Sequence, residues 1–128
     1  MSKTALTIMY TVDSTVDEGL RDARLRAARY LTSDYTAKVK AEPRQYLPDI
    51  WRQHRAYLAV RLRSLAREAG APSDGPAAAY RQWEMTTTPT GRDEWHGTPA
   101  KLVIFLMLAR PSKRDPWRIS DVLVNDGG

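Results

Sequence analysis

The protein is a chain of 128 residues without cysteine, of which 42% are hydrophobic and 27% charged, and its formal net charge is +5. This length is typical of one domain, residues 1–128, and the composition excludes a disordered or fibrous protein. Without cysteine there is no disulfide, no thiolate nucleophile and no cysteine-ligated zinc site. The basic charge favours an anionic partner, but the arginines are scattered, which indicates a solvated surface rather than a nucleic-acid site.

Three helices are predicted in the first third of the chain. Residues Ala5–Tyr10 are apolar at helical spacing, and Thr15 precedes Glu18 by three residues, as in a capping box that starts a helix. The hydroxyls of Thr32 and Ser33 both offer an N-cap for a third, short helix over residues 34–41. The second helix should be amphipathic and should pack on a broad surface such as a sheet, because its stripe consists of small and apolar side chains: Leu20, Ala23, Ala27 and Leu31.

The segment Asp49–Ala69 admits two interpretations. Large side chains recur in it at helical spacing: Trp51, His54, Leu58, Leu62 and Leu65. The alternation of Leu58, Val60 and Leu62 with small or charged residues is equally typical of a half-buried strand. Alanine, leucine and arginine are good helix formers, so local propensity favours the helix.

The second half of the chain is predicted to form strands. A loop over Gly70–Ala77 precedes three segments with the composition of strands: Tyr80–Thr88, Lys101–Arg110 and Trp117–Val124. The turns between them are short, so we expect an antiparallel meander. The segment Lys101–Arg110 is apolar on both faces, which predicts either a central strand covered on both sides or a strand that forms an interface.

Six short motifs, spread over nearly the whole chain, carry a resemblance to known proteins. They are YTVD (10–13), RAA-YLT (26–32), W--HRAY (51–57), AYRQW (79–83), TPTGRDEW-G (88–97) and WRISDV (117–122). With these motifs the chain resembles actinobacterial proteins of mobile genetic elements. Its order of helices and strands resembles the nuclear transport factor 2-like superfold. The motifs are structural rather than catalytic, so they indicate a fold more than an activity.

The resemblance implies an α+β fold in which N-terminal helices pack on a strongly curved, cone-like antiparallel sheet of about four strands. It assigns residues 55–66 to the first strand, against the local helix propensity. The similar proteins include the extracytoplasmic domain of TcpC-like conjugation proteins and the inner-membrane assembly factors of type IV secretion systems. In that group a membrane-spanning helix precedes the domain, and the domain oligomerises and holds channel parts together.

The resemblance therefore implies a domain tethered at the outer face of the cytoplasmic membrane by an N-terminal anchor that this chain lacks. A cytoplasmic location is the alternative if the chain is complete. The longest apolar run, Leu102–Ala109, is much shorter than the roughly 20 residues with which a helix crosses a bilayer.

No catalytic, cofactor-binding or metal-binding residues are predicted. His54 has no carboxylate facing it nearby in the sequence, which favours a structural role, and the acidic turn around His96 favours a solvated position. Enzymes of the resembled superfold carry an aspartate paired with a histidine or tyrosine, and Asp13 and Tyr35 are the candidates here, but their spacing does not pair them. The P-loop, the nucleophile elbow and the dinucleotide-binding fingerprint are all missing from the sequence.

Association is therefore the predicted role, with Val103, Phe105, Met107 and Trp95 as interface candidates. The first three share the face of their strand that the helices should leave uncovered. The other tryptophans are expected in the core: Trp51, Trp83 and Trp117. The leading hypothesis is a non-enzymatic assembly domain of a conjugative, type IV secretion-like apparatus, whose partners are copies of itself and other channel proteins. The alternatives are a small-molecule-binding or catalytic cone, and a basic nucleic-acid-binding module.

Overall fold

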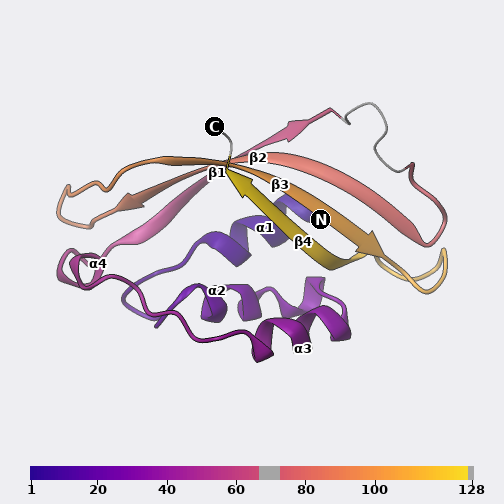
Figure 1. Cartoon of the computed structure of the whole chain (residues 1–128), viewed down its shortest axis with the longest axis horizontal. Helices are drawn as coiled ribbons and strands as arrows, with labels where there is room; N and C mark the ends of the chain where they lie inside the picture. Colours follow the sequence, from indigo (N-terminus) through magenta and orange to yellow (C-terminus); the bar gives the residue numbers. More distant parts are fainter. Residues whose placement is uncertain (67–72, 127–128) are drawn as a thin grey trace.

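The computed structural model describes residues 1–66 and 73–126 and shows an α+β fold with the helices first and the sheet second (Figure 1). The helical half contains α1 (Ser2–Tyr10), α2 (Leu20–Arg26), the 3₁₀ turn η1 (Ala28–Tyr30), α3 (Ser33–Ala41) and α4 (Asp49–Gln53). The strands are β1 (Tyr57–Leu65), β2 (Ala78–Thr90), β3 (Ala100–Ala109) and β4 (Arg118–Asp126). They pair in sequence order and antiparallel, so the predicted meander is confirmed. Part of the predicted loop Gly70–Ala77, residues 70–72, lies outside the described residues.

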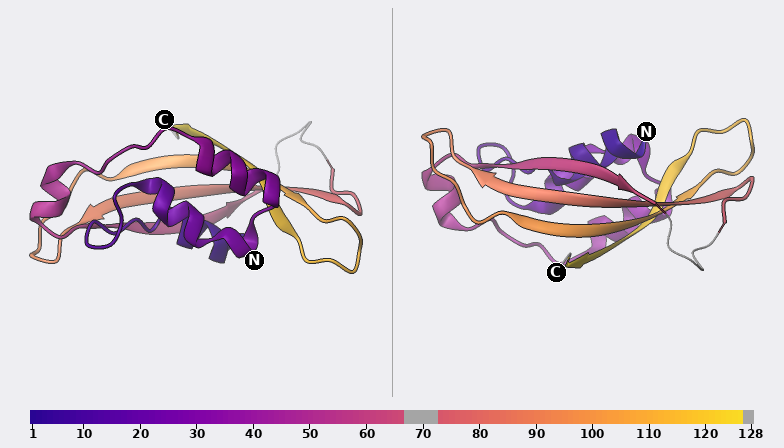
Figure 2. Two further views of the ribbon diagram at one scale, coloured as in Figure 1. Left: turned by 90° about the horizontal axis from the view of Figure 1, so that it is seen from below. Right: turned by 90° about the horizontal axis from the view of Figure 1, so that it is seen from above.

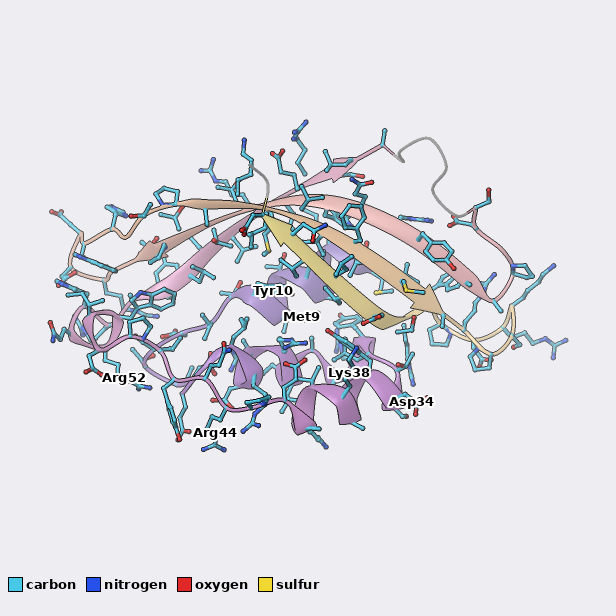
Figure 3. The ribbon with its side chains drawn as sticks, viewed as in Figure 1. Met9, Tyr10, Asp34, Lys38, Arg44 and Arg52 are labelled. Carbon is cyan, nitrogen blue, oxygen red and sulfur yellow. The ribbon has the colours of Figure 1, made fainter. Side chains whose placement is uncertain are left out.

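The helices cover one face of the sheet. In Figure 1, α1, α2 and α3 lie below the strands, and in the view from above in Figure 2 the strands lie in front of the helices. One buried cluster joins the two layers; it includes Leu6, Met9, Ala27, Leu31, Val39, Met85, Ile104, Leu106 and Ile119. Figure 3 shows Met9 and Tyr10 in this layer, between the helices and the strands. Its members remove apolar surface from water, which stabilises a fold by about 25 cal/mol per Å².

The ambiguous segment after Asp49 divides into a one-turn helix and a strand. Helix α4 ends at Gln53, Arg55 has a φ of 49°, and β1 then pairs with β2 along its whole length. The backbone N–H of Leu58 also donates to the carbonyl of Val12, 2.8 Å away. The strand assigned on resemblance is thus confirmed, and the helix favoured by propensity is wrong, because pairing with β2 outweighs a local preference of a few tenths of a kcal/mol per residue.

The predicted capping box at Thr15 is wrong. Helix α2 begins only at Leu20, and its N-cap Gly19 makes no side-chain capping bond. The hydroxyl of Thr15 instead donates to the Asp13 carboxylate, 2.8 Å away. The backbone N–H of Asp13 donates to the Asp17 carboxylate at 2.9 Å, and this bond closes the turn. Aspartate side chains that satisfy nearby backbone groups compete with helix formation in this way.

The predicted start of the third helix is confirmed. The Thr32 hydroxyl accepts a hydrogen bond from the N–H of Tyr35 at 3.2 Å and caps α3. The backbone N–H of Thr32 also donates to the carbonyl of Ile119 in β4, 2.9 Å away. Three residues of the stripe predicted to face a sheet are buried: Ala23, Ala27 and Leu31. Helix α2 itself packs mainly against α1 and α3, and Leu31, which follows it, forms a β-bridge with Ile119 of β4.

Replacing Gly19 by alanine should destabilise the fold. A Cβ there would lie 1.8 Å from the carbonyl oxygen of Gln45, so the segment over the start of α2 would have to move. We expect Gly19→Ala to lower the free energy of unfolding by about 1–3 kcal/mol in urea denaturation. Gly75→Ala is the matched control, because its nearest neighbour, the Ala78 oxygen, would be 3.9 Å away. Equal stabilities of the two variants would contradict the packing described here.

Candidate functional site

The face of the sheet turned away from the helices, which we call the outer face, carries an apolar strip. The strip consists of Val103, Phe105 and Met107 of β3 and Leu123 of β4, and the register places Phe105 beside Leu123. Met107 is 43% exposed and Leu123 60%, whereas Ile104, the neighbour of Phe105, is fully buried. Side chains alternate between the two faces of a strand. The inner strand β3 therefore has one apolar face under the helices and one facing solvent.

Charged side chains border the strip on the side of β1 and β2. Arg63 and Glu84 face each other across these strands, with Arg63 Nη2 and Glu84 Oε2 2.9 Å apart. The hydrogen bond to Arg63 lowers the pKa of Glu84 and the same bond raises the pKa of Arg63. Exposed pairs of this kind contribute little to stability. They give the outer face a polar border around an apolar centre, as protein interfaces have.

The fourth interface candidate, Trp95, lies elsewhere. The turn after β2 packs against the end of α4, at the left of Figure 1, and there the rings of Trp95 and His54 stack in parallel planes with their centroids 4.8 Å apart. His54 Nδ1 and Asp93 Oδ2 are 2.6 Å apart, and this hydrogen bond lowers the pKa of Asp93. Sequence reasoning missed this carboxylate partner of His54, because 39 residues separate the two side chains.

An ion pair fastens the same turn to the helical half. Arg92 Nη2 and Asp13 Oδ2 are 2.7 Å apart, and the Arg92 guanidinium also donates to the carbonyl of Arg55, where the chain has positive φ. Hydrogen bonding to Arg92 lowers the pKa of Asp13 from 3.8 to about 2, and bonds from Thr15 act in the same direction. Asp13 is thus engaged in holding the turn, away from Tyr35, the other residue considered for an acid–base pair.

Tyr35 belongs to a polar cluster between the helices. Arg24 of α2 binds Glu42 after α3 at 2.5 Å and donates to the Tyr35 hydroxyl at 2.9 Å. Tyr10 of α1 is 7% exposed, and burial raises its pKa to about 12, helped by the nearby Tyr35. The Tyr10 hydroxyl therefore stays protonated, and remains a hydrogen-bond donor, at any physiological pH.

Other residues singled out from the sequence have structural positions. Trp83 and Trp117 pack against the core as expected, while Trp51 is half-buried outside the core cluster. His96 is exposed and forms an isolated β-bridge with Thr90. Within residues 1–66 and 73–126, no three histidine, aspartate or glutamate side chains are grouped to hold a metal ion. No helix in these ranges is long and apolar enough to cross a membrane.

The Asp13–Arg92 pair should give the protein a measurable acid sensitivity. The pKa of Asp13 is lowered in the folded state, so its contribution to stability is present above its ordinary value of 3.8 and is lost as the pH falls towards about 2. Asp13→Asn should reduce the free energy of unfolding at neutral pH and flatten its fall between about pH 4 and pH 2, measured by urea denaturation.

Arg92→Gln should have the same effect as Asp13→Asn, and the double variant should lose little more than either single variant, because the two side chains act as a pair. Parallel pH profiles for the wild type and Asp13→Asn would show that the pair contributes nothing.

The chain was compared with known proteins. No family model, curated protein or solved structure matches it. The geometry of its own side chains is therefore the basis for assigning a function: an apolar strip on the outer face, a fastened turn at one end of the sheet, and a polar cluster between the helices.

Proposed function

We propose that this chain is a non-enzymatic assembly module that pairs with a second copy of itself through the outer face of its sheet. The observation that carries the proposal is the exposure of Met107 and Leu123, 43% and 60%, beside Phe105 at the centre of a sheet whose other face is covered. None of the described helices lies on the outer face (Figure 2). An exposed apolar patch with a polar border is typical of an association surface.

A second copy is the occupant that fits this surface. Two sheets pack face to face at about 10 Å with their inner side chains interdigitated, as in a β-sandwich. A two-fold pair uses the same patch on both copies and closes, so that no apolar strip is left to recruit a third chain. The Arg63–Glu84 pair would lie at the border of such a contact, where charged groups can stay hydrated.

The polar clusters support a role other than catalysis or nucleic-acid binding. His54 is held between Asp93 and Trp95, and Asp13 is held by Arg92, so these side chains serve to fix the turn. Many arginines that make the chain basic are also paired with carboxylates: Arg24, Arg26, Arg44, Arg63, Arg81 and Arg92. Arginines neutralised within the protein have less charge to offer to phosphates.

The setting we propose for this module is a conjugative DNA-transfer apparatus of the type IV secretion kind. The support is the resemblance to TcpC-like proteins, which also underlies three finer proposals. The sheet would be the strongly curved sheet of a cone-like, nuclear transport factor 2-like fold. The domain would be tethered at the outer face of the cytoplasmic membrane by a preceding helix. Its further partners would be other channel proteins.

Substitutions on the outer face should abolish self-association. We expect the mass of the wild type, measured by sedimentation equilibrium, to rise from one chain to two with increasing concentration. The double variant Phe105→Asp, Leu123→Asp should remain a monomer, because pairing would bury two unpaired carboxylates on each copy.

Val16→Asp is the matched control, because Val16 is an exposed apolar residue, 71% accessible, in the turn before α2. This variant should associate like the wild type. Circular dichroism of all the variants separates loss of association from loss of folding. The proposal would be contradicted by a wild type that stays monomeric at every concentration, or by a double variant that still forms dimers.

A further inference from the structure

A cleft lies between the helix layer and the sheet, on the face opposite to the proposed association surface. Its volume is about 360 Å³, and it is lined by residues from α1, α2, α3 and all four strands. Its walls are apolar and include Leu58, Met85 and Leu102. This volume lies at the lower end of the range of about 300–1,000 Å³ that is usual for small-molecule sites, which are mostly apolar with a few polar groups.

The polar groups of the cleft come from the cluster between the helices. Tyr10, Arg24 and Tyr35 line it together. Within the described part of the chain, the Nε–H of Arg24 is buried and has no hydrogen-bond partner. The Tyr35 hydroxyl accepts from Arg24, which leaves its own proton free to donate. A buried donor without an acceptor costs about 1–3 kcal/mol, so the Arg24 Nε–H favours an acceptor supplied by a ligand, to which the two tyrosine hydroxyls can also donate.

The charge of the cluster restricts which acceptor fits. Arg24 is the cation of the cleft, and Glu42 already neutralises it through contacts of 2.5 and 3.3 Å. A carboxylate ligand would add a second negative charge beside Glu42 in a partly buried site, and burying an uncompensated charge is costly. An uncharged acceptor, such as a ketone or ester carbonyl, accepts from the phenol hydroxyls without this penalty.

We propose that this cleft binds a small uncharged amphipathic molecule, whose carbonyl or equivalent acceptor meets the hydroxyls of Tyr10 and Tyr35 and whose aliphatic body lies against the sheet. The site is independent of the outer face. Val124, which lines the cleft, and Leu123, in the apolar strip, are neighbours on opposite faces of β4. Ligand binding and self-association can therefore be tested separately.

The test titrates the full chain with methyl heptyl ketone and follows backbone amide shifts by NMR. We expect saturable shifts around the cleft. Nonanoate, with the same number of carbons, should bind at least tenfold more weakly. Tyr10→Phe should weaken binding of the ketone roughly two- to tenfold, as expected for one lost hydrogen bond.

A matched pair of variants on β4 locates the site. Val124→Trp places a large ring at the cleft and should abolish binding of the ketone, whereas Leu123→Trp on the opposite face should leave it unchanged. The inference is overturned if the ketone gives no saturable shifts, if nonanoate binds as tightly as the ketone, or if Val124→Trp binds like the wild type. Should Val124→Trp fail to fold, Tyr10→Phe and nonanoate still decide the question.

Discussion

The structure depends on one constraint: β3 is apolar on both faces, and the helices cover only one of them. Ile104 and Leu106 close the core against the helix layer, while Phe105 and Met107 point the other way. None of the described helices lies over the second face. The apolar strip therefore remains exposed because the described helices all pack on the other face, and it is the surface through which we propose that the protein associates.

The helix layer fits under the sheet because small residues allow close approach. Ala5, Ala23 and Ala27 are fully buried, so α1 and α2 can lie against each other and beneath the strands. Gly19 leaves room for the segment after α3 to cross the start of α2. The same arrangement leaves part of the space between the layers unfilled, and the cleft with Tyr10 and Tyr35 at its polar end occupies that space.

Local patterns predicted the elements whose signals are local. Three such signals indicated the conformation of the segment in which they occur: the Thr32 cap, the β-branched composition of β2 and the apolar run of β3. The helix start and the two strands predicted from them are confirmed. Strand β1 has helix-forming residues and owes its conformation to pairing with β2, so its alternating pattern left helix and strand open and the resemblance assigned it to strand. The capping box at Thr15 failed because the nearby Asp13 captures its hydroxyl.

The candidate sites were less predictable, because their groups are distant in the sequence. Alternation along one strand was enough to place Val103, Phe105 and Met107 together, but Leu123 joins them only through the register of β4. The partner of His54 is Asp93, 39 residues away. The cleft needs residues from every strand and three helices. Each of these depends on how the layers pack, which no single segment encodes.

The central claim is that a second copy covers the outer face, and the lack of cysteine allows a direct measurement. A single thiol introduced by Leu123→Cys reports on the strip, and one introduced by Val16→Cys reports on an exposed turn. The rate at which a thiol reagent modifies each is measured over a range of protein concentrations. We expect the thiol at position 123 to become protected as the protein concentration rises, and the thiol at position 16 to react at an unchanged rate. Equal rates at both positions, unchanged at every concentration, would contradict it.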